Sequence, residues 1–302
     1  MNIPFTPDLG INVFETGTQS GARMTVLADG RYVVTWHSQG QDGSDYGIFA
    51  QLYTNTGQRI GTSFQVNSYA AGSQDYPQIA ALEDGGFVIV WQSYGQDGDR
   101  YGGYGQRFDA AGQAIGDEFQ INTITYRDQT FISVVGTTDG GFAITFTDYG
   151  ADTSSTSYAD IRLRIYDDQG QPVAADQTVN TVTYRLQTDP KISRIEASGD
   201  ANQLSAGGLV VVWTDLSGSS DHPDRSSYRV LMQRFAEDGT ALGIETQVNT
   251  TAVYTQHIPV VAGLAGGRYV VSWMSTGNED GGGYYYAIVA QVYNGDGTKV
   301  GG

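Results

Sequence analysis

The amino-acid sequence predicts an all-β protein, a five-bladed β-propeller of four-stranded blades that is closed by the N-terminal strand. The prediction depends on a motif that occurs five times, on four strand-like runs in each repeat, and on the lack of helical periodicity. Repeats of this length form one supersecondary unit stacked on copies of itself. We expect a single domain with blades at approximately 13–67, 68–122, 123–180, 181–249, and 250–302 plus 1–12.

The repeated motif is an aliphatic residue followed by Asn, with a Gln seven positions after the Asn. The five glutamines are Gln19, Gln74, Gln129, Gln187 and Gln256. An aromatic residue follows each of them, at Trp36, Trp91, Phe146, Trp213 and Trp273. We expect this aromatic row to belong to the core, because it lies near the end of a strand that is apolar on both faces.

The second repeat shows the strand pattern most clearly. Its four runs, separated by Gly- and Asp-rich turns, are Gln78–Leu82, Phe87–Ser93, Tyr101–Asp109 and Ala114–Asn122. Such runs predict consecutive antiparallel hairpins. The run that begins at Phe87 is apolar on both faces, so its sheet needs a layer on either side. Sheets packed face to face around an axis provide these layers.

The ends of the chain favour a closed ring over an open solenoid, which is the alternative. The last repeat ends at Gly302, five residues after Gly297, while the first begins with the surplus strand end Ile11-Asn12. Residues 298–302 and 8–12 together restore the ten-residue spacing from Gly to Asn of the internal repeats. The N-terminal segment is therefore expected to supply the outer strand of the last blade, which would cover two open sheet edges.

Composition restricts the partners. The formal charge of −17 argues against nucleic acid and anionic membranes, which bind clustered Lys and Arg. The acidity is compatible with plain solubility or with affinity for Ca²⁺. There is no Cys, no apolar run of membrane-spanning length, and no signal-peptide pattern in residues 1–10. We expect a monomeric module that is cytosolic, exported by a signal elsewhere, or part of a larger protein.

Part of the second repeat, DGGFVIVWQSYGQDGDRYGGYGQRFDAAGQAIGDEFQIN (84–122), resembles tandem repeats of large secreted bacterial proteins of the RTX and adhesin type. That resemblance implies an extracellular or cell-surface setting, export without an N-terminal signal, and binding of Ca²⁺ and glycans. The Gly-Gly-x-Gly-x-Asp nonapeptides of RTX calcium rolls are absent, so roll-type Ca²⁺ sites are not implied. The expected architecture is also similar to that of five-bladed lectins such as tachylectin, without a shared sequence motif.

The polar loops after the aromatic row are candidate Ca²⁺ sites, because carboxylates on Gly-rich loops suit an ion that takes six to eight oxygens. The candidate ligands are Asp42, Asp45, Asp97, Asp99, Asp152 and Asp280, with Asp221, Asp224 and Glu279 in the same loops. Their spacing differs between loops and does not match the EF-hand pattern. Asp-Gly pairs that only shape a solvated turn are the alternative interpretation.

The loops before the glutamines offer a candidate glycan surface on the same rim. Their aromatic and basic residues are Tyr69, Tyr126, Arg127, Tyr184, Arg185 and Tyr254. Tyrosine stacks on sugar C–H surfaces and bonds to hydroxyls, although it also fills blade interfaces. The five glutamines would then face the glycan; in the alternative, they serve the fold by bonding loop backbone.

A catalytic interpretation uses carboxylates at the mouth of the axial channel. Asp75, Asp128 and Asp189 each lie within two residues of a repeated Gln, at positions that differ between blades. Five-bladed glycosidases place acids at such positions, and two carboxylates are the minimum for glycoside hydrolysis.

The function predicted from the sequence is a secreted or cell-surface module that binds carbohydrate and is compatible with Ca²⁺. The alternatives are a glycoside hydrolase and a structural spacer of an adhesin. The three predict different surfaces: several similar weak sites for a lectin, one deep axial pocket for an enzyme, and neither for a spacer.

Overall fold

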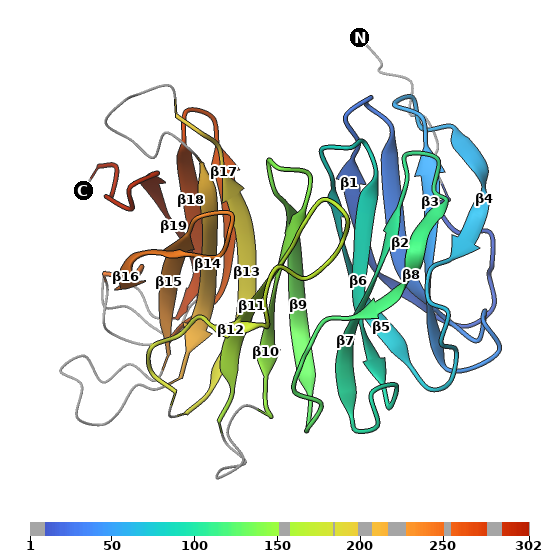
Figure 1. The fold of residues 1–302 in the computed structure, drawn as a ribbon, viewed down its shortest axis with the longest axis horizontal. Coiled ribbons are helices and arrows are strands. Elements are labelled where there is room, and N and C mark those ends of the chain that lie inside the picture. The colour runs from blue at the N-terminus through green and yellow to red at the C-terminus, as the bar shows by residue number, and fades with distance from the viewer. Residues whose placement is uncertain are drawn as a thin grey trace.

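The computed structural model describes residues 10–150, 158–183, 185–198, 207–216, 228–250, 255–276 and 286–301. These residues form nineteen strands and no helix, so the described part of the chain contains no helix that could span a membrane. The strands form five antiparallel sheets, each built from consecutive strands of one repeat. Figure 1 shows the sheets in chain order, from blue on the right to red on the left. The all-β prediction is confirmed.

Each sheet is a blade. Blade one contains β1 (Gln19–Val26), β2 (Tyr32–Gln39), β3 (Tyr46–Tyr53) and β4 (Arg59–Gln65). Blade two contains β5 (Gln74–Ala81), β6 (Phe87–Tyr94), β7 (Tyr101–Phe108) and β8 (Ala114–Gln120). Blade three contains β9 (Gln129–Gly136), β10 (Phe142–Asp148), β11 (Asp160–Tyr166) and the short β12 (Gln177–Thr178). Blade four contains β13 (Gln187–Ile195), β14 (Gly208–Asp215), β15 (Arg229–Phe235) and β16 (Ala241–Gln247), and blade five contains β17 (Gln256–Leu264), β18 (Arg268–Thr276) and β19 (Tyr286–Asn294).

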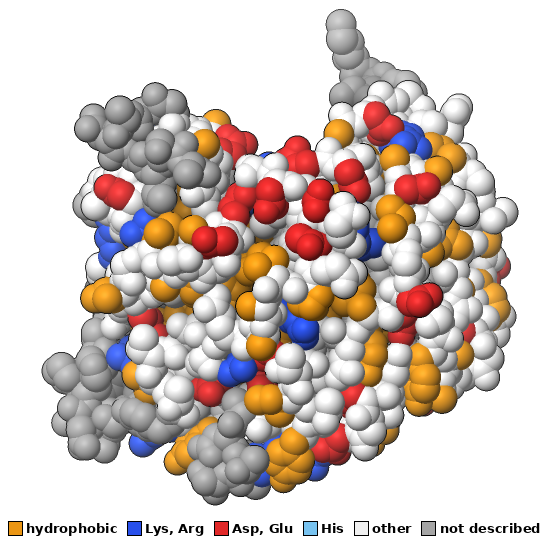
Figure 2. Space-filling model, viewed as in Figure 1, with side chains coloured by type: hydrophobic (Ala, Val, Ile, Leu, Met, Phe, Trp, Pro, Cys, Tyr) orange, Lys and Arg blue, Asp and Glu red, His pale blue; other side chains and the backbone are white. Residues whose placement is uncertain are grey.

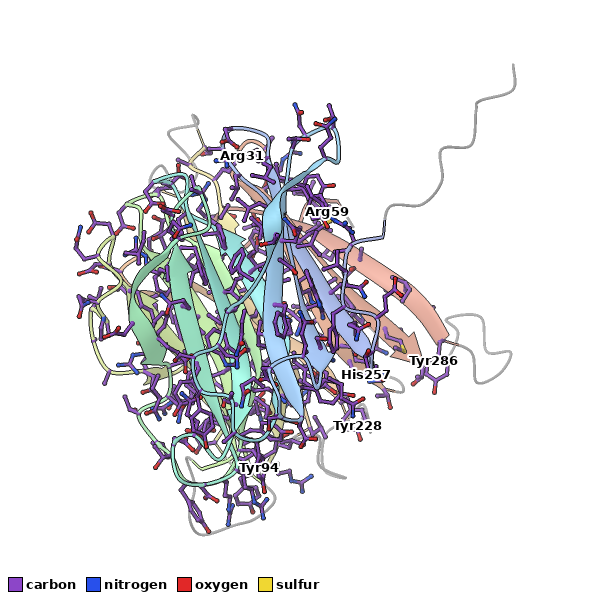
Figure 3. The ribbon with its side chains drawn as sticks, turned by 90° about the vertical axis from the view of Figure 1, so that its right-hand side faces the viewer. Arg31, Arg59, Tyr94, Tyr228, His257 and Tyr286 are labelled. Atoms are coloured by element: carbon purple, nitrogen blue, oxygen red, sulfur yellow. The ribbon has the colours of Figure 1, made fainter. Side chains whose placement is uncertain are left out.

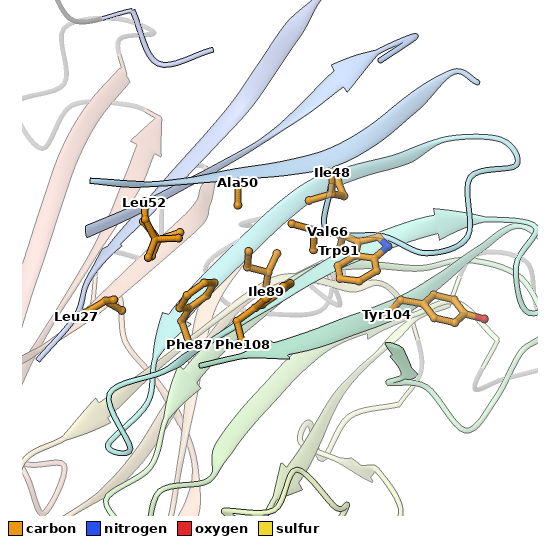
Figure 4. Close-up of a cluster of buried hydrophobic side chains, with 11 residues drawn as sticks. Leu27, Ile48, Ala50, Leu52, Val66, Phe87, Ile89, Trp91, Tyr104 and Phe108 are labelled. Carbon is orange, nitrogen blue, oxygen red and sulfur yellow. The ribbon is translucent and has the colours of Figure 1, made fainter. Parts of the chain in front are cut away.

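The core consists of apolar layers between successive blades. Figure 4 shows the layer between blades one and two, where Ile48 and Leu52 of β3 face Phe87 and Trp91 of β6. The predicted aromatic row is core, because none of its five side chains is more than 6 % exposed. Truncating such a side chain to Ala costs about 3–5 kcal/mol of folding free energy.

The Asn of the repeated motif joins neighbouring blades. Asn67 accepts a hydrogen bond from the Ile48 N–H through Oδ1 at 2.7 Å and donates from Nδ2 to Gln74 Oε1 at 3.2 Å. Asn122 makes the equivalent bonds to the Gly103 N–H and to Gln129. One side chain thus ties the third strand of its own blade to the first strand of the next, which explains the fixed spacing.

Ring closure is seen in part. Tyr53 of blade one donates a hydrogen bond to the Ile11 carbonyl at 3.0 Å, and Tyr293 of blade five donates one to the Val248 carbonyl at 3.3 Å. The motif residue Ile11 therefore contacts the blade that follows it in the same way as the motif residue Val248 does. Blade five has three strands, and no described residue of the N-terminal segment pairs with β19. Ile288 of β19 is 77 % exposed, whereas its repeat equivalent Ile48 is fully buried. Closure by the N-terminal strand stays a prediction.

The two ends of the molecule differ. Tyr94, Tyr228, His257 and Tyr286, which lie at or next to strand ends, are all in the lower half of Figure 3, whereas Arg31 and Arg59 are in the upper half. The loops that enter the first strands and those that follow the second strands therefore share one face, as predicted; we call it the loop end. Figure 2 shows acidic side chains gathered along the opposite edge, over the hairpin turns.

Candidate active site

A cavity of about 750 Å³ lies between the first strands of the five blades. Each of these strands contributes to its wall, through Arg23, Gln78, Ile132, Lys191 and Val260. Aromatic side chains form much of the remaining wall, with polar groups between them: Tyr76, Tyr101, Phe131, Tyr149, Gln92, Thr130 and Asp128. The volume and the mixture of aromatic and polar groups suit a small organic ligand.

Every first strand carries the same β-bulge. Its register shifts where two residues face the single buried aromatic residue of the second strand, as between Asp75 and Gln78 opposite Trp91. The first bulge residue has a positive φ in all five blades: 67° at Gly21, 52° at Tyr76, 53° at Phe131, 54° at Asp189 and 53° at Ile258. Bulges redirect side chains beside active sites. The left-handed conformation costs a non-glycine residue about 1–3 kcal/mol.

His37 of blade one positions the bulge of blade two. The Tyr76 N–H donates to His37 Nδ1 at 3.2 Å, so Nδ1 is the acceptor and Nε2 carries the proton that bonds Ser20 Oγ at 2.6 Å. Burial, with the nearby charge of Arg23, lowers the pKa of His37 and favours this neutral form. A side chain of one blade thus fixes the backbone beside the cavity in the next.

Asp75 precedes this bulge and is 8 % exposed. Tyr101 donates to its Oδ2 at 3.5 Å, while Oδ1 has no partner of hydrogen-bond geometry. Burial raises the pKa of Asp75 to about 6, although Gln92 and Tyr101 favour its charged form. Burial and the Asp75 charge raise the pKa of Tyr101 to about 12, so this phenol keeps its proton. Asp75 is therefore a carboxyl group that carries a proton in mildly acidic solution.

Asp128 and Asp75 both accept hydrogen bonds from Tyr101. The Oδ1 of Asp128 accepts the Tyr101 N–H at 3.3 Å, its Oδ2 is 3.4 Å from Arg100, and it lines the cavity. The structure thus brings Asp75 and Asp128 together around one tyrosine. Their environments differ, because Asp75 is buried with one free oxygen and Asp128 is paired with a cation.

Asp189 lies on the bulge of blade four, on another side of the cavity. Burial raises its pKa, and the charges of Lys191 and His257 act in the opposite direction. Lys191 lines the cavity and donates to the Pro190 carbonyl at 3.1 Å; burial lowers its pKa. Of the three carboxylates singled out from the sequence, Asp128 lines the cavity, while Asp75 and Asp189 lie on the first strands of blades two and four, next to and within the bulges.

The repeated glutamines serve the fold. Gln74, Gln129, Gln187 and Gln256 are at most 1 % exposed. Gln129 donates to the Tyr126 carbonyl and to Asp148, each at 3.1 Å, and Gln19 on blade one bonds the Thr16 carbonyl. The four buried amides have no surface for a glycan, which favours the structural alternative for them, whereas Gln19 is half-buried.

The predicted rim residues do not form one site in the described part of the chain. Tyr126 is exposed, and the Arg127 guanidinium lies 4.9 Å from the centre of its ring. Tyr69 is half-buried, and Arg185 adopts a positive φ before Gln187. Tyr184 and Tyr254 lie outside the described residues. Among the rim residues that the structure describes, Arg127, which stacks on Tyr126, reaches the cavity wall through the Tyr149 carbonyl at 3.5 Å.

The candidate Ca²⁺ ligands shape their loops. Asp42 accepts the Ser44 N–H at 3.0 Å, and Asp97 accepts from the Asp99 N–H at 3.3 Å and from Asn122 at 3.1 Å. Asp99 in turn accepts the Arg127 N–H, and Asp45 is exposed. Among the described residues no group of three or more acidic or His side chains is arranged to hold a metal. The remaining candidates lie outside the described residues: Asp152, Asp221, Asp224, Glu279 and Asp280.

Of the bulge residues, only Asp189 was singled out from the sequence, and the cavity cations Arg23 and Lys191 were not. Proline marks the position of the bulge in the sequence. Three prolines each lie three residues after a repeated Gln: Pro77, Pro190 and Pro259. Proline within a strand marks an edge or a bulge, since it lacks an N–H for the ladder. Aligning the repeats at this point identifies Tyr76 and Phe131 as the variable residues beside a constant Gln.

Several solved structures share the fold of this protein. No protein-family model and no curated relative matches the sequence. Among solved structures, a protein of unknown function from Dyadobacter fermentans has a TM-score of 0.57 at 12% identity, over 93% of this chain and 80% of that one. The GH93 α-L-arabinofuranosidase of Fusarium graminearum with arabinobiose scores 0.54 at 12% identity, over 90% and 80%. A thermostable family-43 glycoside hydrolase scores 0.50 at 11% identity, over 95% and 94%. At these identities the likeness shows the fold, a β-propeller architecture.

The raised pKa of Asp75 predicts pH-dependent stability. The folded protein favours the protonated acid, so its contribution is complete below pH 3.8 and is lost as the pH rises through about 6. Asp75→Asn should therefore raise the melting temperature at pH 8 by several degrees, the equivalent of roughly 3 kcal/mol at most, with little effect at pH 4. Asp45→Asn, at an exposed loop, is the control. An equal shift of the Asp75 variant at both pH values would contradict this prediction.

Ca²⁺ binding by the Asp-rich loops is tested by melting. Millimolar Ca²⁺ added to chelator-treated protein should raise the melting temperature, because a ligand at a hundred times its Kd stabilises the folded state by about 2.7 kcal/mol. Asp97→Ala with Asp99→Ala also removes turn hydrogen bonds. The informative quantity is therefore the rise in melting temperature that Ca²⁺ produces, which should be smaller in the double variant than in the wild type. Melting curves unaffected by chelator would assign these residues to the turns alone.

Proposed function

We propose that this protein is a glycoside hydrolase whose active site is the axial cavity. The observation that carries the proposal is Asp75, a buried carboxyl group with one free oxygen, next to a second carboxylate at a cavity of ligand size. This cavity is lined by the first strands of all five blades, as expected of an axial enzyme site, whereas the cavities of about 190 and 330 Å³ lie at the outer strands. Perturbed carboxyl groups at a cleft are typical of catalytic sites.

The two acids differ in the way that glycoside hydrolysis requires. Asp75, with its pKa raised to about 6, would act as the general acid that protonates the oxygen of the leaving sugar. Asp128, paired with Arg100, would be the carboxylate that activates water or attacks the anomeric carbon. The Tyr101 hydroxyl bonded to Asp75, and its N–H bonded to Asp128, hold both in place. Asp189 and Lys191 would bind substrate hydroxyls from the opposite wall.

Similar structures are consistent with this proposal, since two of the three described above are glycoside hydrolases. The hydrolase alternative is thus better supported than the lectin interpretation. A secreted or cell-surface setting and a glycan partner accord with an enzyme that acts on polysaccharide.

Hydrolysis tests the proposal directly. The purified protein is incubated with nitrophenyl glycosides, including the α-L-arabinofuranoside, and with plant oligosaccharides, and the products are separated. Asp75→Asn and Asp128→Asn should each lower kcat at least a hundredfold, the usual contribution of a positioned acid or base. The wild-type rate should fall as the pH rises through about 6, because Asp75 then loses its proton.

Asp45→Asn is the matched control, since it makes the same change at an exposed loop carboxylate. It should leave the rate unchanged. Release of product from no substrate in the panel, or full activity in both active-site variants, would overturn the assignment.

We further propose that Gly10–Asn12 completes blade five as its outer strand, which closes the ring of blades. In blades one and two the third strand pairs Phe49 with Gln65 and Tyr104 with Gln120. The same repeat positions in blade five are Val289 and Gly10. The chain has no Cys, so Gly10→Cys with Val289→Cys should form a disulfide on mild oxidation.

The control pair for this cross-link is Gly10→Cys with Ile244→Cys, because Ile244 is an exposed residue of blade four. A disulfide in the first pair alone supports closure. Cross-linking of neither pair, or of both to the same extent, would favour the open arrangement.

A further inference from the structure

The first bulge residues of the five blades form a set that we call the bulge ring. This set contains side chains that the fold does not require. Gly21 in blade one has the same positive φ and the same register shift as its equivalents in the other four blades. Glycine takes this conformation without steric strain. Bulky or β-branched residues adopt it rarely. The backbone geometry is therefore available to glycine, yet four blades carry a side chain there.

Packing does not account for the two aromatic members of the ring. Tyr76 is 61 % exposed and Phe131 is 45 % exposed, and both line the cavity. Tyr76 meets the edge of the His37 ring at a centroid distance of 5.7 Å, but its backbone is already fixed by the bond from its N–H to His37. These aromatic rings therefore face the cavity at the expense of strain.

The ring is asymmetric. Blades two and three present Tyr76 and Phe131, whereas blade four presents Asp189 and blade one presents no side chain. Two residues further along, the first strands of blades one and four place Arg23 and Lys191 at the cavity. Arg23 bonds Gln78 and the Ala22 carbonyl, and Lys191 bonds the Pro190 carbonyl, all of them neutral groups. One side of the cavity is thus aromatic and the other offers N–H donors.

We propose that Tyr76 and Phe131 are the platform on which the cavity binds a sugar ring, with Arg23 and Lys191 bonding its hydroxyl oxygens from the other side. The proposal rests on the proposed function and specifies its recognition step. A sugar has an apolar C–H face that stacks on aromatic rings and a polar rim that accepts N–H donors. The platform lies beside Asp75, which directly precedes Tyr76, so a stacked sugar would lie next to the candidate acid.

The test separates ligand binding from folding. Tyr76→Gly and Phe131→Gly are made in the Asp75→Asn background, so that binding is measured without turnover. Calorimetry uses linear trimers of arabinofuranose, xylose, galactose and galacturonic acid. Each Gly variant should bind the best trimer about tenfold more weakly, the loss expected for one stacking contact. Its melting temperature should be equal or a few degrees higher, because glycine removes the strain.

Ile258→Gly is the matched control. Ile258 has the same φ and the same bulge but is not among the residues that line the described cavity. Its substitution should raise the melting temperature and leave trimer affinity unchanged. Tyr76→Phe retains the aromatic face and should keep the affinity within about twofold.

The outcomes distinguish this inference from the hydrolase assignment. If a trimer binds and the Gly variants lose it, while the wild type hydrolyses nothing, the platform stands and the hydrolase fails. Unchanged affinity in both Gly variants, or melting temperatures lowered as by a core substitution, would overturn the platform even in an active enzyme. Failure of every trimer to bind would also overturn it.

Discussion

The buried aromatic residue on each second strand is the constraint on which the rest of the structure depends. It fills the layer between blades, and in blades four and five the indoles of Trp213 and Trp273 donate to Gln187 and Gln256, which anchor the start of the first strand. Opposite the same aromatic residue the first strand bulges, because two residues occupy the space of one. Core, motif and cavity wall therefore arise from one repeated contact, and a change at that contact alters all three.

The bulge also explains how a symmetric scaffold holds an asymmetric site. The backbone at this point is the same in all five blades; in blade one the His37 ring leaves no room for a Cβ at Gly21, while the other four blades carry different side chains there. Glycine, two aromatic residues, a carboxylate and an aliphatic residue occupy the five positions. The scaffold supplies position, while the individual blades supply the chemistry.

The architecture was predictable from the sequence because packing repeats. The four strands of blade two end within two residues of the expected positions, since Gly-rich turns mark them. Its first strand begins at Gln74 rather than Gln78 because the bulge carries the ladder past Pro77. The site was predictable only in part: Asp75, Asp128 and Asp189 were identified from their departure from the repeat. Tyr76, Phe131 and Lys191 were missed, because one residue more or less in a bulge reverses which side chains face the axis.

The same reasoning explains why the carboxylates differ chemically although they lie close to equivalent glutamines. Asp75 follows its Gln, so its side chain lies inside the wall, where burial favours the protonated form. Asp128 precedes its Gln at the strand entrance, where Arg100 and a backbone N–H bond the anion. A shift of two positions along one strand thus separates a buried carboxyl group from one that is paired with a cation. In a ring of near-identical blades, the position of a carboxylate relative to the anchored Gln thus decides how deeply it is buried and which groups bond it.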